Sequence, residues 1–285
     1  MDIMKQAVYK IKQLIPDKTY LKLQYKYHFD KKLNLDNPIT YNEKIQWLKL
    51  NDRRPEYTTY VDKYSVREYI KNKIGETYLI PLIGVFDSVE NIDWDSLPNS
   101  FVLKCTHGSS SNIICKDKST LDIHDSKCIL EKWMNKNWFW YGREWPYKNV
   151  RPRIICEKYM VDESKVELKD YKIFCFNGEP KLIQVDFNRF DNHQRNIYDI
   201  NWNYINASIK HPTNPKKAIK RPDGLEEMLR IARILSKEIP HVRVDLYSIN
   251  ELTYFGELTF YHGSGYEKIE PQSLNDAMGS WIELW

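Results

Sequence analysis

Residues 243–265 read RVDLYSINELTYFGELTFYHGSG. Apolar and polar side chains alternate before and after a short polar segment at 248–251, as in two strands joined by a turn. The stretch therefore predicts an antiparallel hairpin. If odd-numbered positions face one another, Asp245 and Glu257 are neighbours on one face of a sheet. The same face then also carries Arg243 and Thr259.

Oxygen ligands predominate on this face. Two carboxylates and the Thr259 hydroxyl, with Arg243 beside them, are typical of a site for Mg²⁺ and for the phosphates that Mg²⁺ carries. The flexible segment from Gly263 to Gly265 can bring backbone N–H groups close to an anion. The alternative is an ordinary hairpin whose acidic residues face water, because alternating acids are common on exposed sheet faces.

The composition predicts a soluble, globular protein that can bury a core, since 42% of its 285 residues are hydrophobic and 29% are charged. No window approaches the roughly 18 apolar residues of a membrane span. The N-terminus lacks the pattern of a secretory signal. Five cysteines without a C-x-x-C pair argue against a disulfide scaffold or a zinc ribbon. These features predict a reducing compartment, the cytoplasm.

The net charge of +4 suits anionic substrates and is too small to indicate nucleic acid. Residues 1–28 show a basic amphipathic pattern, in which lysines separate apolar residues at helical spacing. These apolar residues are Ile3, Val8, Ile11, Leu14 and Ile15. Such a helix can make peripheral contact with an anionic membrane. The alternative is that it packs on its own domain.

The segment that follows is predicted to be mainly helical. Thr40 and Glu43 have the spacing of a capping box that opens a helix. A further helix is expected over residues 60–74, with Asp62-Lys63 in its first turn and Gly75 after its end. Residues 81–86 form a short apolar run, which predicts a strand.

From Phe101 the pattern changes to strands. The runs FVLKCT and IICK flank a polar loop at 107–112 and predict a second hairpin. Lys104 and the backbone N–H groups of Gly108 to Asn112 could together hold a chain of phosphates. The loop lacks the G-K-[ST] sequence of a Walker A loop. The alternative is a plain hairpin turn in which the serines serve only the backbone conformation.

The remaining chain predicts a mixed fold. A helix is expected over 125–140, ending in aromatic residues that either stack on sugar rings or pack between lobes. A tight turn is expected at Asn177-Gly178. A basic loop at 210–221 separates the strands from helices over 224–238 and 272–282. The strands are expected at 153–160, 170–177, 180–188 and 196–200.

In this order the segments resemble the ATP-grasp superfamily, and more closely its TupA-like branch, which is associated with teichuronopeptide biosynthesis. Six strings between Pro38 and the C-terminus carry the resemblance: PITYNEKIQWLKL, DKYSVREY, FVLKCTHGS, EKYM, DYKIFCFNG and GELTFY. Each string alone is weakly specific, whereas the set is highly specific. The resemblance implies an α+β ATP-grasp fold, in which two α+β lobes hold ATP between antiparallel sheets, with an N-terminal helical region.

The resemblance also implies domains and an activity. The implied domains are 1–98, an N-terminal helical region; 99–157, a small lobe with the phosphate loop; and 158–285, a large lobe with the metal site. Members phosphorylate a carboxylate with ATP and Mg²⁺, and an amine then attacks the acyl phosphate to give an amide. For this chain the implied acceptor is a uronic-acid or polyglutamate-type carboxyl in cell-surface polysaccharide, such as capsule, teichuronopeptide or O-antigen.

Roles for single residues follow from the same resemblance. Lys63 and Lys104 hold phosphates, Lys172 adds a phosphate contact, and Asp170 is placed at the ribose. Arg243 steadies the transferred phosphoryl group and is implied to be catalytic together with Lys104 and Lys172. The implied metal ligands are Asp245, Glu257 and Thr259, and the implied phosphate loop is His107, Gly108, Ser109, Ser110, Ser111 and Asn112. The implied adenine hinge is Glu157, Lys158, Tyr159 and Met160. The acceptor is implied to bind Arg189, His262, Gly263, Ser264 and Gly265.

Three features depart from the family pattern. Thr259 stands where many members have an asparagine metal ligand, so the sequence is compatible with one or two Mg²⁺ ions. The phosphate loop has one glycine and three serines where a looser loop is usual. His262 stands where proline is expected in close relatives, which leaves the contacts of the acceptor open.

Two other classes of function compete with the ligase. A glycosyltransferase that uses a nucleotide sugar would need a D-x-D metal motif, and the sequence Asp93-Trp94-Asp95 matches one in a turn-like stretch. A non-catalytic protein that binds an anionic polymer or a membrane would use the basic residues at 1–28 and 210–221. The second class leaves the ordered set of phosphate and metal residues unexplained.

Overall fold

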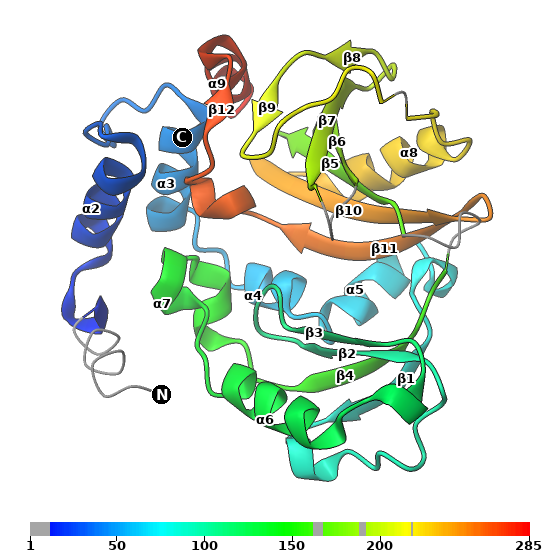
Figure 1. Ribbon diagram of the computed structural model, residues 1–285. Coiled ribbons are helices and arrows are strands. Elements are labelled where there is room, and N and C mark those ends of the chain that lie inside the picture. The colour runs from blue at the N-terminus through cyan, green and yellow to red at the C-terminus, as the bar shows by residue number, and fades with distance from the viewer. Residues whose placement is uncertain (1–11, 162–167, 188–191, 218) are drawn as a thin grey trace. The chain divides into compact units, whose positions relative to one another are not determined.

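The computed structural model describes residues 12–161, 168–187, 192–217 and 219–285 (Figure 1). Helices combine with antiparallel sheets, which confirms the predicted α+β class. Two compact units are present. Unit 1 comprises Met1–Arg53, Trp140–Trp145 and Lys169–Trp285, and unit 2 comprises Arg54–Phe139 and Pro146–Leu168. The division into regions 1–98, 99–157 and 158–285 assigns functions rather than compactness and stays a prediction.

Unit 1 is built on a six-stranded antiparallel sheet with the strand order β11-β10-β5-β6-β7-β8. Its strands are β5 (Asp170–Phe176), β6 (Glu179–Phe187), β7 (Gln194–Asp199), β8 (Tyr204–Ile205), β10 (His241–Ile249) and β11 (Leu252–Thr259). Asn177 and Gly178 join β5 to β6 with φ values of 47° and 86°, as expected for a tight hairpin turn.

The hairpin predicted from residues 243–265 is the pair β10 and β11. Its turn lies at Asn250 and Glu251, whose φ values are 49° and 68°. Asp245 pairs with Glu257 and Arg243 pairs with Thr259, so the predicted register is confirmed. The register shifts beyond Asp245, where a Cβ on Gly256 would lie 2.9 Å from the Asp245 carbonyl oxygen. Only glycine fits this close approach.

Helices cover the two faces of this sheet. The helix α8 (Leu225–Ser236) packs against β5, β6 and β10, where Cys175 Sγ lies 3.9 Å from the Ala232 carbonyl oxygen (Figure 1). The other face meets α3 (Tyr41–Asn51), whose Tyr41 hydroxyl contacts His241 on β10. The capping box predicted at Thr40 opens this helix.

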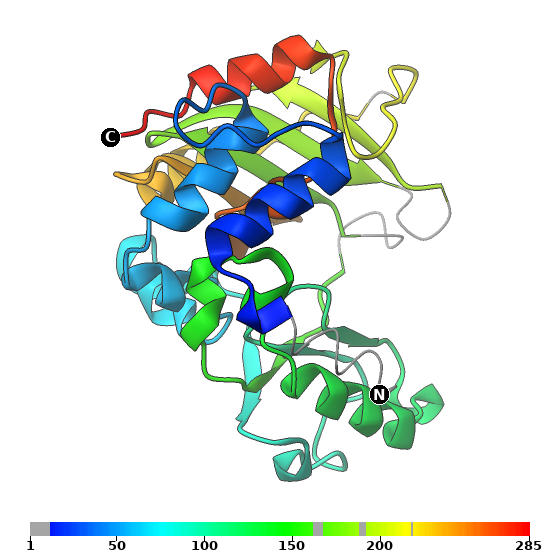
Figure 2. The same cartoon turned by 90° about the vertical axis from the view of Figure 1, so that its left-hand side faces the viewer.

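Two more helices complete unit 1. Figure 2 shows α9 (Gln272–Ser280) beside α3, and the short strands β9 (Ser208–Ile209) and β12 (Ile269–Glu270) pair with each other. The helix α2 (Asp17–Phe29) packs its buried Tyr20, Leu21 and Tyr25 against side chains that include Trp47 and Leu50 of α3.

Unit 2 is built on a four-stranded antiparallel sheet with the order β1-β4-β2-β3. Its helix α6 (Ile123–Met134) packs on β2, and Phe101, Leu103, Leu130 and Ile154 form a fully buried core (Figure 1). The strands are β1 (Leu82–Phe86), β2 (Phe101–Cys105), β3 (Asn112–Cys115) and β4 (Ile154–Lys158). Its other helical segments are α4 (Glu56–Val61), α5 (Val66–Lys73), η1 (Glu76–Tyr78), η2 (Val89–Asn91), η3 (Lys118–Thr120) and η4 (Trp145–Asn149), whereas most of α7 (Phe139–Gly142) belongs to unit 1.

The continuous helix expected over residues 60–74 is wrong. The structure has α4 and α5 with a break at Asp62, which ends α4. The Asp62 carboxylate accepts hydrogen bonds from the Tyr64 amide at 3.0 Å and the Ser65 hydroxyl at 2.7 Å, and it pairs with Arg153 at 2.8 Å. These local acceptors compete with helical hydrogen bonds and therefore interrupt the helix.

No helix within the described ranges is long and apolar enough to cross a membrane. Of the basic amphipathic segment at 1–28, residues 1–11 lie outside the described residues. The expected membrane contact of this segment stays a prediction.

Candidate functional site

The first group of predicted residues gathers on one face of β5, β10 and β11. Asp245 lies directly opposite Lys172 of β5 on one side and Glu257 of β11 on the other. Asp170 and Lys172 share this face because they are two residues apart on β5. We call Asp170, Lys172, Arg243, Asp245, Glu257 and Thr259 the strand cluster.

Asp245 is the centre of the strand cluster. Its Oδ1 accepts a hydrogen bond from Arg243 Nε at 2.6 Å, and its Oδ2 accepts from Arg243 Nη2 at 2.7 Å and Lys172 Nζ at 2.6 Å. Lys172 also donates to Asp170. Burial is the largest influence on the pKa of Asp245 and raises it, while Arg243 and Lys172 act in the opposite direction. The carboxylate is therefore held in place by two cations.

Glu257 gives the strand cluster its contact with solvent. Its side chain is 33% exposed, whereas the side chains of Asp245 and Arg243 are only 2% and 8% exposed. Thr259 Oγ1 donates to Glu257 Oε1 at 3.1 Å and accepts from Arg243 Nη2 at 3.1 Å. The hydroxyl thus orients the Glu257 carboxylate on the side where a ligand can enter.

The donor atoms of the strand cluster suit a hard cation. Asp245, Glu257 and Thr259 present only oxygen atoms, which Mg²⁺ prefers to nitrogen and sulfur. Neither this cluster nor any other part of the described chain contains a group of three or more His, Cys, Asp or Glu side chains that could hold a metal ion. A Mg²⁺ ion here would need further oxygen ligands, and Mg²⁺ commonly takes these from water and phosphates.

A second series of contacting polar and charged side chains begins at His262. Its imidazole contacts Arg243 on one side and lies 2.9 Å from Glu267 Oε2 on the other. Burial, followed by the charge of Arg243, lowers the pKa of His262 to about 4. Glu267 also lies 3.3 Å from Arg195 Nη1, and Arg195 pairs with Asp186 at 2.6 Å. His262 is therefore neutral near pH 7.

The segment from Gly263 to Gly265 is fastened to α3 through its carbonyl oxygens. All three residues have φ values between 54° and 67°. Lys49 Nζ donates to the Ser264 carbonyl at 2.7 Å and to its hydroxyl at 2.9 Å, and Asn42 donates to the Gly265 carbonyl at 3.0 Å. These bonds hold a left-handed backbone that a non-glycine residue such as Ser264 rarely adopts.

Lys49 itself is fully buried. Burial lowers its pKa to about 7, and the nearby Glu144 carboxylate acts in the opposite direction. Its ammonium also lies 4.7 Å from the ring centre of Tyr266. A buried lysine with these partners ties the predicted acceptor segment to the N-terminal helices.

The predicted phosphate loop forms the tip of the β2–β3 hairpin in unit 2. The Cys105 amide donates to the Ser111 carbonyl at 3.1 Å, and Lys104 lies opposite Asn112. Lys63 Nζ donates to the Gly108 carbonyl at 2.6 Å. We call residues 107–112 the serine loop. Lys63 is thus brought to the loop, as its predicted role requires.

The half-buried Lys104 and the buried Glu157 form an ion pair that the sequence did not suggest. Lys104 Nζ lies 2.7 Å from Glu157 Oε2, and Arg67 Nη1 lies 3.1 Å from Glu157 Oε1. Arg67 also donates to the Ile80 carbonyl at 2.9 Å. The Glu157 side chain therefore positions Lys104, so a role of Glu157 in an adenine hinge would have to use its backbone.

The other predicted residues are less closely organised. Lys158 is exposed, and Tyr159 and Met160 are half-buried at the end of β4. Arg189 lies outside the described residues. The motif Asp93-Trp94-Asp95 serves the fold, since Trp94 is buried and the Asp93 carboxylate accepts from the Ser96 amide at 3.4 Å.

Several contacts could not have been found from the sequence. Arg67, Lys49, Glu144 and Arg195 all support predicted residues through partners that are distant along the chain, such as Lys49 with Ser264, which is 215 positions away. A charged residue at an otherwise apolar helix position is the only signal, and Lys49 between Leu48 and Leu50 shows it.

The chain was compared with solved structures, with curated proteins and with models of protein families. Among solved structures, D-alanine–D-alanine ligase from Bacillus anthracis is 15% identical, with a TM-score of 0.42 over 71% of this chain and 57% of that chain. The same enzyme from Helicobacter pylori is 14% identical, with a TM-score of 0.42 over 86% of this chain and 67% of that chain. The ATP-grasp ligase PsnB is 8% identical, with a TM-score of 0.41 over 85% of this chain and 66% of that chain. Its structure was solved in complex with a phosphomimetic variant of its minimal precursor, Mg and ADP.

No curated protein matches the sequence. The chain spans less than two thirds of the length of the Bacillus anthracis ligase. A family model described as TupA-like ATPgrasp matches residues 43–283, which is most of the chain. The chain therefore belongs to the TupA-like ATP-grasp family.

Proposed function

We propose that this protein is an ATP-dependent ligase that joins a carboxylate to an amine through an acyl phosphate. The observation that carries the proposal is the alignment of Lys172, Asp245 and Glu257 across three neighbouring strands. Family membership supports the same chemistry. The transfer of a phosphoryl group needs charge neutralisation and positioning, which cations and Mg²⁺ supply without a covalent nucleophile.

Each predicted site residue that the structure describes has a role in this proposal. Asp245, Glu257 and Thr259 hold Mg²⁺, which neutralises phosphate charge when it is bound. Arg243, Lys104 and Lys172 bind the phosphates, and Asp170 contacts the ribose. The backbone of residues 157–160 binds adenine, and the serine loop covers the phosphates together with Lys63. The segment 262–265 binds the acceptor. The fixed hydrogen-bond donors of the site stabilise the negative charge that develops during phosphoryl transfer.

The proposed acceptor is a uronic-acid or polyglutamate-type carboxyl in cell-surface polysaccharide assembly, and the second substrate is an amine or amino acid. This part rests on the TupA-like family. The proposed location is the cytoplasm, where ATP is available, with peripheral membrane contact through the basic N-terminal residues.

A thermal-shift titration with Mg·ATP, UDP-sugars and CMP-sugars tests the nucleotide. A ligand present at ~100 times its Kd stabilises the folded state by about 2.7 kcal/mol, which is readily measured. We expect Mg·ATP alone to raise the unfolding temperature, and Lys104→Ala to weaken this shift. A shift with nucleotide sugars and none with Mg·ATP would replace the ligase by a glycosyltransferase.

Substitution of the carboxylates tests the metal assignment. We expect Asp245→Asn and Glu257→Gln each to abolish turnover, because each removes a negatively charged oxygen ligand. The readout is ADP release in the presence of uronates with hydroxylamine, which converts an acyl phosphate into a hydroxamate that forms a coloured complex with Fe³⁺. Glu251→Gln is the matched control, since Glu251 is an exposed carboxylate in the turn of the same hairpin.

Circular dichroism distinguishes loss of activity from loss of fold in these variants. Asn has nearly the same shape as Asp, so Asp245→Asn is expected to keep the native spectrum, although Arg243 and Lys172 lose a charged partner. Full turnover of both Asp245→Asn and Glu257→Gln would exclude these residues as metal ligands.

A further inference from the structure

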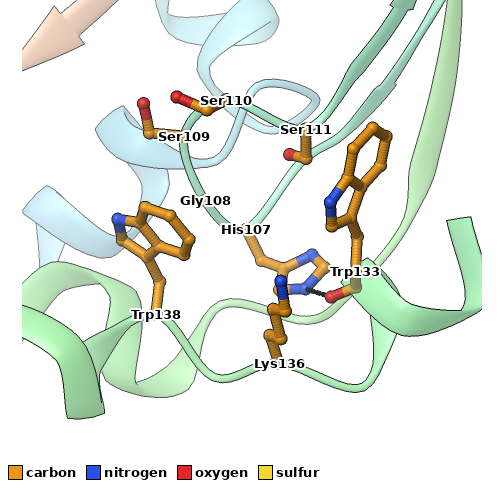
Figure 3. Close-up of a pocket in the computed structure, with 8 residues that line it drawn as sticks. All are labelled: His107, Gly108, Ser109, Ser110, Ser111, Trp133, Lys136 and Trp138. Atoms are coloured by element: carbon orange, nitrogen blue, oxygen red, sulfur yellow. Dashed lines mark hydrogen bonds between the residues drawn. The ribbon is translucent and has the colours of Figure 1, made fainter. Parts of the chain in front are cut away.

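A small cavity lies where the serine loop meets the end of α6 (Figure 3). Its volume is about 190 Å³, and all its lining residues belong to unit 2. Sites for drug-sized ligands have volumes of roughly 300–1,000 Å³. The cavity therefore suits one small ring rather than a whole nucleotide.

Two residues that line this cavity each have a buried polar atom without a partner. His107 is 5% exposed and Ser111 is 6% exposed. Neither His107 Nδ1 nor Ser111 Oγ makes a hydrogen bond within the described part of the chain. An unsatisfied buried polar atom costs about 1–3 kcal/mol, so such atoms commonly mark a place for water or a ligand.

The protonation of His107 defines what Nδ1 requires. His107 Nε2 lies 3.2 Å from the Trp133 carbonyl oxygen, and a carbonyl can only accept, so Nε2 carries the proton. Burial lowers the pKa of His107, whereas the backbone carbonyls of Trp133 and Lys136 act to raise it. The net shift is downward, so the imidazole is neutral near pH 7. Nδ1 is consequently a lone-pair acceptor, and it needs a donor such as a ligand hydroxyl.

The walls of the cavity add apolar surface and a positive charge. Figure 3 shows the indoles of Trp133 and Trp138 on opposite sides, with His107 and Lys136 between them. The Trp138 ring packs on the loop, because a Cβ on Gly108 would lie 3.3 Å from it. Indole faces bind apolar ring surfaces, and the Lys136 ammonium favours an anionic substituent.

We infer that this cavity binds a single sugar ring that carries a carboxylate, that is, a hexuronate unit. The C–H face of a pyranose covers an indole, a ring hydroxyl donates to His107 Nδ1, and the carboxylate lies near Lys136. A carboxylate or phosphate ion alone offers no apolar face to the two indoles. A nucleobase is uncharged and leaves Lys136 without a function.

The side-chain atoms proposed to bind the sugar differ from the backbone N–H groups of the serine loop that are proposed to bind nucleotide phosphates. In Figure 3 the hydroxyls of Ser109 and Ser110 point away from both indoles, although these two residues line the cavity together with Ser111 and His107. The hydroxyls of Ser109 and Ser110 are therefore not directed at a ring that lies between the two indoles. The inference rests on the cavity alone and requires no ATP chemistry.

Isothermal titration calorimetry of the full chain tests the inference, with methyl β-D-glucuronide and methyl β-D-glucoside as probes. We expect the glucuronide to bind about tenfold or more tightly than the glucoside, because it adds a charge-assisted bond to Lys136. Lys136→Met should reduce the glucuronide affinity to that of the glucoside. Lys132→Met, which removes an exposed charge from α6, should leave the affinity unchanged.

Three outcomes would overturn the inference: equal affinity for the two glycosides, no binding of the glucuronide, or full affinity in Lys136→Met. Displacement of the glucuronide by inorganic phosphate would show a simple anion site instead. Displacement by Mg·ATP would assign the cavity to the nucleotide. Because the glycosides are titrated without nucleotide, failure of the ligase proposal leaves this result unaffected.

Discussion

His241 is held in its neutral form by two hydrogen bonds. Its Nδ1 donates to the Cys175 carbonyl at 2.9 Å, so its Nε2 accepts from the Tyr41 hydroxyl at 2.9 Å. Burial is the main cause that lowers the pKa of His241, from 6.5 to about 3. The unfolded chain therefore binds more protons between these two values, and the stability that neutral His241 contributes, complete above pH 6.5, is lost as the pH falls.

We expect the free energy of unfolding to fall by about 1.4 kcal/mol per pH unit from this residue across that window. Urea denaturation at several pH values measures the slope. His241→Asn, whose amide retains a donor for the Cys175 carbonyl, should lower the slope by this amount. His262 and the carboxylates titrate in both proteins, so their contributions cancel. Parallel pH curves for the two proteins would show that His241 does not carry this dependence.

At the scale of elements, the segment 262–265 depends on glycine for two separate reasons. Gly265 has a φ of 67°, and a Cβ on it would lie 2.6 Å from Ile45 Cγ2 and 2.5 Å from Gln46 Nε2 of α3. We expect Gly265→Ala to destabilise the protein by about 2–4 kcal/mol, because backbone strain and overpacking add. Thermal and urea unfolding measure this change.

Gly178→Ala separates the two causes. Gly178 also has a positive φ, 86°, but its nearest neighbour to a new Cβ is 3.7 Å away, so only backbone strain is added. We expect a cost of about 1 kcal/mol for this control. Equal costs for Gly178→Ala and Gly265→Ala would mean that the close contact with α3 relaxes freely.

The same scale shows what local sequence can predict. The β10–β11 hairpin and its register followed from alternation and one polar turn, and the α3 cap followed from Thr40 and Glu43. Periodicity failed at Asp62, because a side-chain acceptor replaced the helical acceptors of nearby amides. Alternation sees which face a residue occupies, whereas competition for one hydrogen bond depends on geometry.

At the scale of the molecule, charge pairing escaped the sequence. Lys104 and Arg67 converge on Glu157, and Arg195 joins its strand neighbour Asp186 to Glu267, which is 72 positions away along the chain. Patterns within a window of a few residues carry no information on such pairs. The strand cluster was predictable because β10 and β11 are consecutive, while the part of β5 in it depended on strand order.

Each unit has its own buried core, and this leads to a prediction about cooperativity. Leu130 of α6 is fully buried with Phe101, Leu103 and Ile154 in unit 2, and Leu235 of α8 is fully buried in unit 1. We expect Leu130→Ala to cost about 2–5 kcal/mol through the cavity that it leaves.

Domains with separate cores can open separately. Hydrogen exchange should therefore accelerate in β2, β3 and β4 while β5, β6 and β10 keep their protection, and Leu235→Ala should produce the reverse pattern. Equal loss of protection in both units, from either substitution, would mean that the two cores unfold as one cooperative structure.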